Sequence, residues 1–238
     1  MENTIYSTIT RQSGLLQEMQ VIANNIANMS TRGFRQQGVV FSEFVRKTGD
    51  GPSLSMAIAN TNSTAFAGGE LTQTNNPFDF AIEGVGFFLV ETEQGVRLTR
   101  AGSFQPTAQG ELLSPEGFRL LDVAESPVRI SGDVSEIFVA PDGTISNARQ
   151  PLTKIGLVVP TNTEALQRED GVLFNAGQAF EPTEDATLRR GFLEGSNVDP
   201  ILQIARMIEV QRGYEMGQKF LDREDARIRD AMKSFTRY

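Results

Sequence analysis

The sequence predicts an α+β fold, in which a long helix at each end of the chain flanks a β-rich middle. Three observations predict it. All ten prolines lie between Pro52 and Pro200, so neither end carries the residue that breaks helix interiors. Both ends show apolar residues at spacings of three, four or seven, which is typical of amphipathic helices that pair as coiled coils. Glycine-punctuated runs of β-branched and aromatic residues fill the middle, as in sheets.

The first segment predicts one amphipathic helix that ends near Gly33. Asn24, Asn25 and Asn28 lie beside its apolar face. Asparagine is a poor helix former, because its side chain competes for backbone hydrogen bonds, so these amides need an explanation. The apolar face itself consists of Ile5, Ile9, Leu16, Met19, Ile22 (or Ala23) and Ile26.

The last segment predicts a helix from about residue 200 to 233. Asp199 and Pro200 fit an N-cap followed by a first-turn proline. At 1.5 Å per residue the helix is about 50 Å long. Its stripe has a near-heptad register and includes Ile204, Ile208, Gln211, Tyr214, Gly217, Leu221 and Ile228.

Arg212 has two interpretations. In one, it forms a salt bridge with Glu209 or Glu215 along its own helix, at a spacing of three residues. In the other, this part of the helix docks against another helix. Gly213 and Gly217 favour docking, because each costs about 1 kcal/mol relative to alanine in a helix while letting a neighbour approach closely.

The chain therefore divides into three predicted parts. Residues 1–33 and 197–238 form a discontinuous helical coiled-coil domain. Residues 34–75 are rich in Gly, Ser, Thr and Asn and have little periodicity, which favours an extended linker arm. Residues 76–196 form a β-rich domain of eight or more short strands, with a hairpin turn at Asp142-Gly143.

The composition argues against an enzyme. The absence of cysteine and histidine excludes disulfides, thiolate metal sites and every histidine-based triad. Glu91 and Glu93 share one strand face, yet a solvated face explains them without a glycosidase-type carboxylate pair. Asp142 fits a turn without the ligand pattern of a calcium loop. We expect no catalytic residue, no cofactor, no metal and no small-molecule substrate.

The charge distribution limits the partners. The net charge is −8, and residues 71–200 alone contribute −10, which argues against nucleic acid, since phosphate binding needs a basic footprint. No run approaches the roughly 20 apolar residues of a membrane span. The opening "MENTIYSTIT" lacks the basic and apolar regions of a secretory signal, so we expect no cleaved signal peptide.

Four stretches of the sequence together resemble one known family. They are "QVIANNIANMSTRGF" (20–34), "GGELTQTNNPFDFAIEGVGFFLV" (68–90), "LTRAGSFQPTAQGELLSPEGFRLL" (98–121) and "GFLEGSNVDPILQIARMIEVQRGYEMGQKFLDRED" (191–225). In this order they resemble the flagellar axial proteins of the rod and hook. The chain is most similar to proximal rod members. A distal rod or hook-type axial protein is the close alternative.

The resemblance implies a non-enzymatic subunit of the bacterial flagellar basal-body rod, located in the periplasm. Such subunits leave the cytoplasm through the flagellar type III export apparatus, without signal cleavage. They polymerise with copies of themselves and with proximal and distal rod subunits into a shaft that transmits motor torque. Two alternatives from other classes are a β-rich surface or adhesion protein with a helical stalk, and a carboxylate-based hydrolase.

The resemblance also suggests what the terminal helices contact. We expect the N-terminal residues Ile5, Ile9, Leu16, Met19, Ile22, Asn24, Asn25, Ile26 and Asn28 to lie at subunit interfaces. In the C-terminal helix we expect the same of Ile204, Ile208, Gln211, Arg212, Tyr214, Gly217, Leu221 and Ile228. The three asparagines then either satisfy polar groups between subunits and fix the packing register, or bond nearby backbone at a fraying helix end.

Overall fold

A computed structural model of the chain contains two compact units, which we describe separately. The helical unit comprises Met1–Ala27, Gln36–Ala65 and Asp199–Tyr238, and the β unit comprises Asn28–Arg35 and Phe66–Val198. The structure describes residues 2–46, 54–130, 137–147, 150–163, 166–169, 171–177, 180–183 and 185–235. For residues 2–4, 42–46, 54–62 and 235 the description covers the backbone only.

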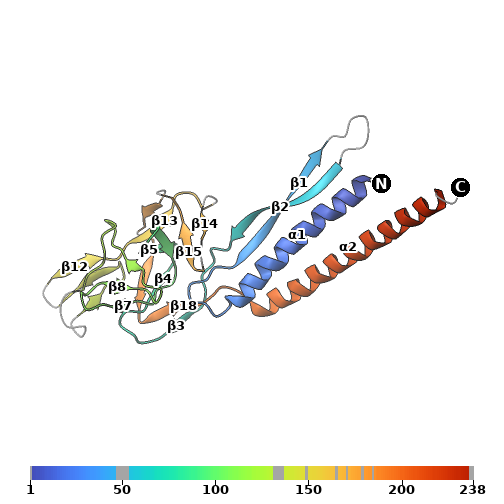
Figure 1. The fold of residues 1–238 in the computed structure, drawn as a ribbon. Coiled ribbons are helices and arrows are strands. Elements are labelled where there is room, and N and C mark those ends of the chain that lie inside the picture. The colour runs from blue at the N-terminus through green and yellow to red at the C-terminus, as the bar shows by residue number, and fades with distance from the viewer. Residues whose placement is uncertain are drawn as a thin grey trace. The chain divides into compact units, whose positions relative to one another are not determined.

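The helical unit is built on α1 (Glu2–Ala27) and α2 (Pro200–Phe235). They lie side by side in antiparallel orientation, with both termini of the chain at one end of the pair (Figure 1). Asp199 caps α2, because its Oδ1 accepts hydrogen bonds from the backbone N–H groups of Ile201 (2.9 Å) and Leu202 (3.1 Å). The predicted pair of terminal helices and the predicted cap of the second helix are both confirmed.

A β-hairpin completes the helical unit. Strands β1 (Gln37–Arg46) and β2 (Leu54–Thr64) pair antiparallel, with a bulge between Val40 and Phe41, and both contact α1 (Figure 1). Residues 34–75, for which the sequence predicts an extended arm, thus contain a paired hairpin. The prediction followed the high content of Gly, Ser, Thr and Asn. It overlooked the alternation of Leu54, Met56 and Ile58 with other residues, which is the strand signal in this segment.

The β unit confirms the predicted β-rich middle. Strand β5 (Phe87–Thr92) lies at its centre and pairs antiparallel with β6 (Gly95–Thr99), β9 (Arg119–Leu120) and β13 (Leu157–Pro160). The same sheet contains β7 (Gln105–Pro106), β8 (Leu112–Leu113), β14 (Gln167–Arg168), β15 (Leu173–Asn175) and β16 (Phe180–Pro182).

Three smaller sheets complete the β unit. A three-stranded sheet has the order β10 (Phe138–Val139), β11 (Thr144–Ser146), β12 (Pro151–Lys154), and its β10–β11 turn contains the predicted Asp142-Gly143. Two antiparallel pairs join segments far apart in sequence: β4 (Phe80–Glu83) with β17 (Thr187–Arg190), and β3 (Leu71–Gln73) with β18 (Phe192–Glu194).

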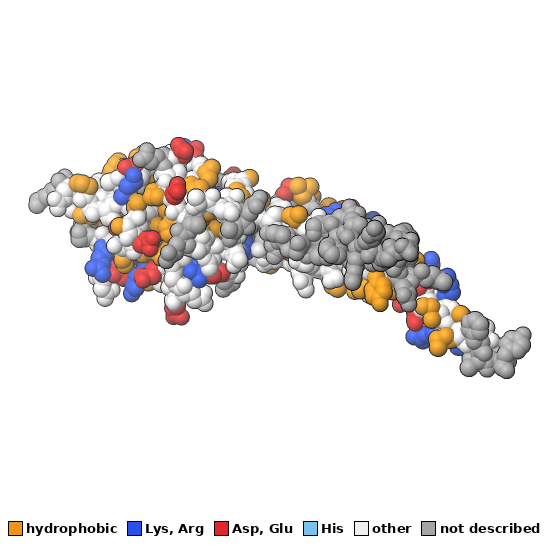
Figure 2. Space-filling model, turned by 90° about the horizontal axis from the view of Figure 1, so that it is seen from above, with side chains coloured by type: hydrophobic (Ala, Val, Ile, Leu, Met, Phe, Trp, Pro, Cys, Tyr) orange, Lys and Arg blue, Asp and Glu red, His pale blue; other side chains and the backbone are white. Residues whose placement is uncertain are grey.

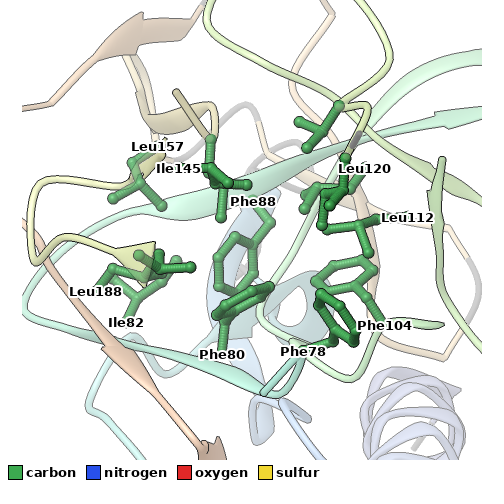
Figure 3. Close-up of a cluster of buried hydrophobic side chains, with 14 of the residues drawn as sticks. Phe78, Phe80, Ile82, Phe88, Phe104, Leu112, Leu120, Ile145, Leu157 and Leu188 are labelled. Atoms are coloured by element: carbon green, nitrogen blue, oxygen red, sulfur yellow. The ribbon is translucent and has the colours of Figure 1, made fainter. Parts of the chain in front are cut away.

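The first four residues of β5, Phe87–Val90, are buried on both faces of the strand, which explains why all four are apolar. Phe88 and Val90 belong to one hydrophobic cluster, while Phe87 and Leu89 belong to another, as the alternation of side chains along a strand requires. Figure 3 shows the first cluster, in which Phe80, Phe88 and Phe104 lie together. The ring centroids of Phe88 and Phe104 are 5.8 Å apart in an edge-on arrangement.

Gly102 lies where two backbone segments of the β unit meet. Its carbonyl accepts a hydrogen bond from the N–H of Phe80 (2.8 Å). A Cβ here would overlap the Phe80 carbonyl oxygen and approach Cε2 of Phe88 at 3.0 Å.

We therefore expect Gly102→Ala to lower the free energy of unfolding of the β unit by about 1–3 kcal/mol, because the backbone must move apart. Amide hydrogen exchange at β5 and β6 in increasing urea measures this loss. Gly117→Ala is a control in the same unit, because a Cβ there meets nothing within 4 Å and only its positive φ of 92° opposes the change. Equal stability of Gly102→Ala and the original chain would contradict the prediction.

Candidate interaction site

The contact between α1 and α2 is rich in polar side chains. The Nε2 of Gln12 donates to the backbone oxygen of Tyr214 (2.9 Å), and the Nε of Arg206 donates to Oε1 of Glu18 (2.7 Å). Gln12 and Glu18 are 7% and 8% exposed. Leu15 of α1 also approaches Gly213 of α2, and Val21, Ile22 and Val210 are buried within the unit. The contact between the helices thus includes two buried polar side chains, whereas an ordinary coiled-coil seam is apolar at such positions.

Asn25 is the most buried of the three asparagines, with 1% of its surface exposed. Its Nδ2 donates to the backbone oxygen of Gln37 (2.8 Å) and to Oε1 of Gln203 (3.2 Å), and its Oδ1 accepts from the N–H of Gln37 (2.9 Å). Asn24 bonds the side chain of Gln37 (2.9 Å), and Asn28 accepts from Thr31 just beyond the helix. Asn25 thus fixes α1, α2 and the hairpin to one another within the chain.

Two glycines of α2 face α1. A Cβ at Gly213 would lie 3.6 Å from Cδ1 of Leu15, and one at Gly217 would overlap the side chain of Gln12. The close approach predicted for these glycines therefore exists within the chain. Among the described residues Arg212 forms no ion pair. Of its two predicted partners, Glu209 pairs with Arg206, and Glu215 accepts a hydrogen bond from Gln211.

The outer surfaces of both helices carry apolar side chains. On α1, Tyr6, Ile9 and Leu16 are exposed, and on α2 an exposed cluster at its start comprises Ile201, Leu202, Ile204 and Ile208. Figure 2 shows hydrophobic side chains on the surface of the helical unit, among basic ones. Further along α2, Met216, Phe220, Ile228 and Met232 are also exposed. We call Tyr6, Ile9, Leu16, Ile201, Leu202, Ile204 and Ile208 the outer apolar faces.

The predicted interface residues divide between these surroundings. Those on the outside are Ile9, Leu16, Asn24, Ile204, Ile208, Gln211, Arg212 and Ile228. Ile22 and Asn25 are buried within the unit, and the half-buried residues are Ile5, Met19, Ile26, Asn28, Tyr214, Gly217 and Leu221.

The β unit contains a buried ion network that the sequence did not predict. The carboxylate of Glu194 contacts Nη1 of Arg35 (2.7 Å) and Nη1 of Arg100 (3.3 Å). Glu194 is 2% exposed, Arg35 1% and Arg100 4%. Arg168 lies near them, stacked over the rings of Phe34 and Phe174.

Burial governs the electrostatics of this network. It lowers the pKa of Arg100 to about 10, although Glu194 opposes the shift. Burial and the neighbouring charge of Arg35 lower the pKa of Arg168 to about 10 as well. With pKa values near 10, Arg100 and Arg168 both stay charged at neutral pH.

Two of the acidic residues considered in the sequence analysis have polar partners in the structure. Glu91 pairs with Arg119 (3.2 Å), and Asp142 accepts hydrogen bonds from Thr144 within its turn. Among the described residues no cluster of acidic side chains could hold a metal ion. Neither helix, over its described residues, contains the apolar stretch that a membrane span requires.

Comparisons with known proteins identify the family. The flagellar basal-body rod protein FlgF of Caulobacter vibrioides is 34% identical over 239 residues, which cover 98% of each chain. This chain belongs to the flagellar basal-body rod protein family. Three family descriptions match it: "Flagella basal body rod protein" at residues 5–35, "Flagellar hook protein FlgE/F/G D1 domain" at 81–147, and "Flagellar basal body rod FlgEFG protein C-terminal" at 189–233.

Two further rod proteins match over most of their length. FlgF of Escherichia coli is 31% identical, with 94% of this chain and 95% of that protein covered. FlgG of Bacillus subtilis is 30% identical, with 94% and 96% covered. The predicted resemblance is confirmed, and the chain is an FlgF-like, non-enzymatic structural subunit of the flagellar rod.

The ion network draws one residue from each of the three regions that match the rod family. Arg35 ends the first region, Arg100 lies in the second and Glu194 in the third. Sequence reasoning treated these regions as separate motifs. Each of the three regions does contain a local sign of the network, namely a charged residue near glycine and aromatic residues. The stretches are "TRGFR", "LTRAGSF" and "GFLEGS". No pattern of spacing, however, links residues so far apart.

Proposed function

We propose that this chain joins neighbouring subunits of the flagellar rod through the outer apolar faces of α1 and α2. The observation that carries the proposal is the contrast between two surfaces of the same helices. Gln12 and Glu18 are buried in the contact between the two helices of the chain, while Ile9, Leu16 and Ile204 lie exposed. Contiguous exposed apolar residues are typical of interaction surfaces.

The energy available on these faces suits assembly. Burying an aliphatic side chain contributes about 1.5–3 kcal/mol, so a few such residues supply a specific contact. The faces lie on two different helices, and one helix face of a subunit meets a different face of the next. Contacts of this heterologous kind build open helical filaments when they do not close into a ring, which is the geometry of a shaft.

The proposal includes the place of the subunit. The chain is a proximal rod subunit in the periplasm, exported through the flagellar type III apparatus without signal cleavage, and its partners are copies of itself and other proximal and distal rod subunits. Support comes from the FlgF relatives, which match over almost the whole chain. The distal rod is the second candidate, because the FlgG of Bacillus subtilis also matches over nearly the full length.

The predicted interface is tested by placing charges on it. In a strain that lacks its own copy of the protein, we expect Ile204→Asp with Ile208→Asp to abolish swimming. The proposed interface buries both isoleucines, so their loss removes roughly 3–6 kcal/mol per contact between subunits. A carboxylate buried there without a partner adds to the loss. The measurements are the swimming zone in soft agar and the amount of the chain in purified basal bodies.

Val123→Asp provides the matched control, because Val123 is an exposed apolar residue in a turn of the β unit. It makes the same chemical change outside the helical unit, and we expect normal swimming. Circular dichroism of the purified double variant checks that α1 and α2 still form. Normal swimming of the double variant would overturn the proposal.

A further inference from the structure

A groove crosses one side of the β unit. Its larger part is a hollow of about 570 Å³ between the β5–β6 turn and the β8–β9 turn. A second hollow of about 280 Å³ adjoins it and extends toward Thr31 and Ala101. The two hollows share Glu116, Phe118 and Leu173 as lining residues, so they form one continuous groove of the size that proteins use to bind ligand segments.

The larger hollow is acidic. Glu91, Glu93, Glu116 and Glu169 line it together with one cation, Arg119. Two of these carboxylates already have partners: Glu91 pairs with Arg119 (3.2 Å), and Glu169 pairs with Arg97. Glu93 and Glu116 are exposed and have no ion pair among the described residues. The groove therefore offers two carboxylates that a partner's cations can reach.

The smaller hollow is mainly apolar. Val90, Ala101, Phe118, Val172 and Leu173 line it. Phe118 and Leu173 are partly buried and pack against the larger hydrophobic cluster, so the core holds them in place. This end of the groove accepts an apolar side chain, and the unpaired carboxylate of Glu116 lies at its junction with the acidic end.

We propose that the groove binds a basic segment of a different protein. The segment presents lysine or arginine side chains to Glu93 and Glu116 and inserts one apolar anchor beside Phe118 and Leu173. Charge complementarity at the acidic end and apolar burial at the other end then act on one ligand. The proposal goes beyond subunit assembly through α1 and α2, and it does not depend on which faces of those helices are covered.

The charge of the β unit argues against the β unit of a second copy as the occupant. The β unit contains nineteen acidic and eleven basic residues, hence a net charge of −8, which equals the net charge of the whole chain. The helical unit is therefore neutral overall. A second β unit approaching the groove would bring like charge, and like-charge contacts suppress association. A basic segment of a different protein complements the charge of the groove better.

The test is a titration of the isotope-labelled full chain with a short peptide of lysines around a central leucine, followed by amide NMR shifts. We expect shifts confined to residues 91–94, 114–119 and 171–173. Adding salt should weaken binding, because the screening length falls to about 10 Å at 0.1 M. A peptide with serine in place of leucine should bind about tenfold more weakly, because it lacks the anchor.

Variants separate this groove from general attraction to an acidic protein. Glu93→Gln with Glu116→Gln should weaken binding about tenfold, since each exposed charge pair contributes up to about fivefold. Glu70→Gln with Glu181→Gln is the matched control: both side chains are exposed in the β unit, and the pair removes the same charge. Equal weakening by both pairs, shifts elsewhere, or no binding would overturn the proposal, whatever the result for rod assembly.

Discussion

Replacing Glu194 by glutamine is expected to lower the free energy of unfolding of the β unit by about 3–5 kcal/mol, because removing one partner of a buried ion pair leaves the other charge uncompensated. Glutamine keeps the shape of the side chain and one carbonyl oxygen. Among the described residues, it removes the only negative charge in contact with Arg35 and Arg100. The effect is therefore electrostatic and leaves the packing volume unchanged.

The surroundings of Glu194 explain why the loss cannot be absorbed. Its carboxylate also accepts a hydrogen bond from the N–H of Gly69 (2.9 Å), and its backbone oxygen accepts one from the N–H of Gly33 (2.8 Å). Nε and Nη2 of Arg35 and Nε of Arg100 have no hydrogen-bond partner among the described residues. The network already contains more donors than acceptors, so each remaining acceptor matters.

The measurement is amide hydrogen exchange at β5 and β6 in increasing urea, which reports on the β unit alone. A chain of two units need not unfold in a single step, so a global signal would mix them. Glu83→Gln is the matched control, because Glu83 pairs with Arg189 at 2.8 Å while both are about half exposed, and such pairs contribute at most about 1 kcal/mol. Similar losses in the two variants would show that burial of the network carries no special energy.

Much of the fold could be predicted because local chemistry determines it. Asp199 and Pro200 predict the start of α2, and the apolar run from Phe87 to Val90 indicates a strand buried on both faces. The hairpin of β1 and β2 was harder to see. Its second strand is mostly small and polar, and a ladder of backbone hydrogen bonds, to which every residue except proline contributes alike, leaves little trace in composition.

The candidate site shows a different limit. A stripe such as Ile9, Leu16 and Ile204 tells us that a helix has an apolar face, but it does not tell us what covers that face. The structure places these residues outside and places Gln12 and Glu18 between the helices. A polar residue is predicted to be exposed by default, because a buried polar group is costly unless it finds a partner. The partner of Glu18 is Arg206, which lies about 190 positions away in the chain.

A variant of Asn25 tests whether local helix propensity or contacts with distant residues decide this position. We expect Asn25→Ala to lower the free energy of unfolding of the helical unit by about 2–4 kcal/mol. Alanine removes the hydrogen bonds to the partly buried N–H and C=O of Gln37 and to the buried side chain of Gln203, and a buried group left unpaired costs about 1–3 kcal/mol. The better helix propensity of alanine returns only a fraction of 1 kcal/mol. The isolated α1 peptide should instead become more helical, because only the propensity acts there.

Asn24→Ala is the matched control, since it makes the same substitution one position earlier, at an exposed residue whose Nδ2 donates to the side-chain oxygen of Gln37. Hydrogen exchange of the α1 amides in the full chain should show a large loss of protection for Asn25→Ala and little change for Asn24→Ala. Equal protection in the two variants would mean that the amide of Asn25 is a tolerated defect of the helix. A large difference would mean that the sequence accepts a poor helix former here because it connects three elements that no apolar contact could hold in one register.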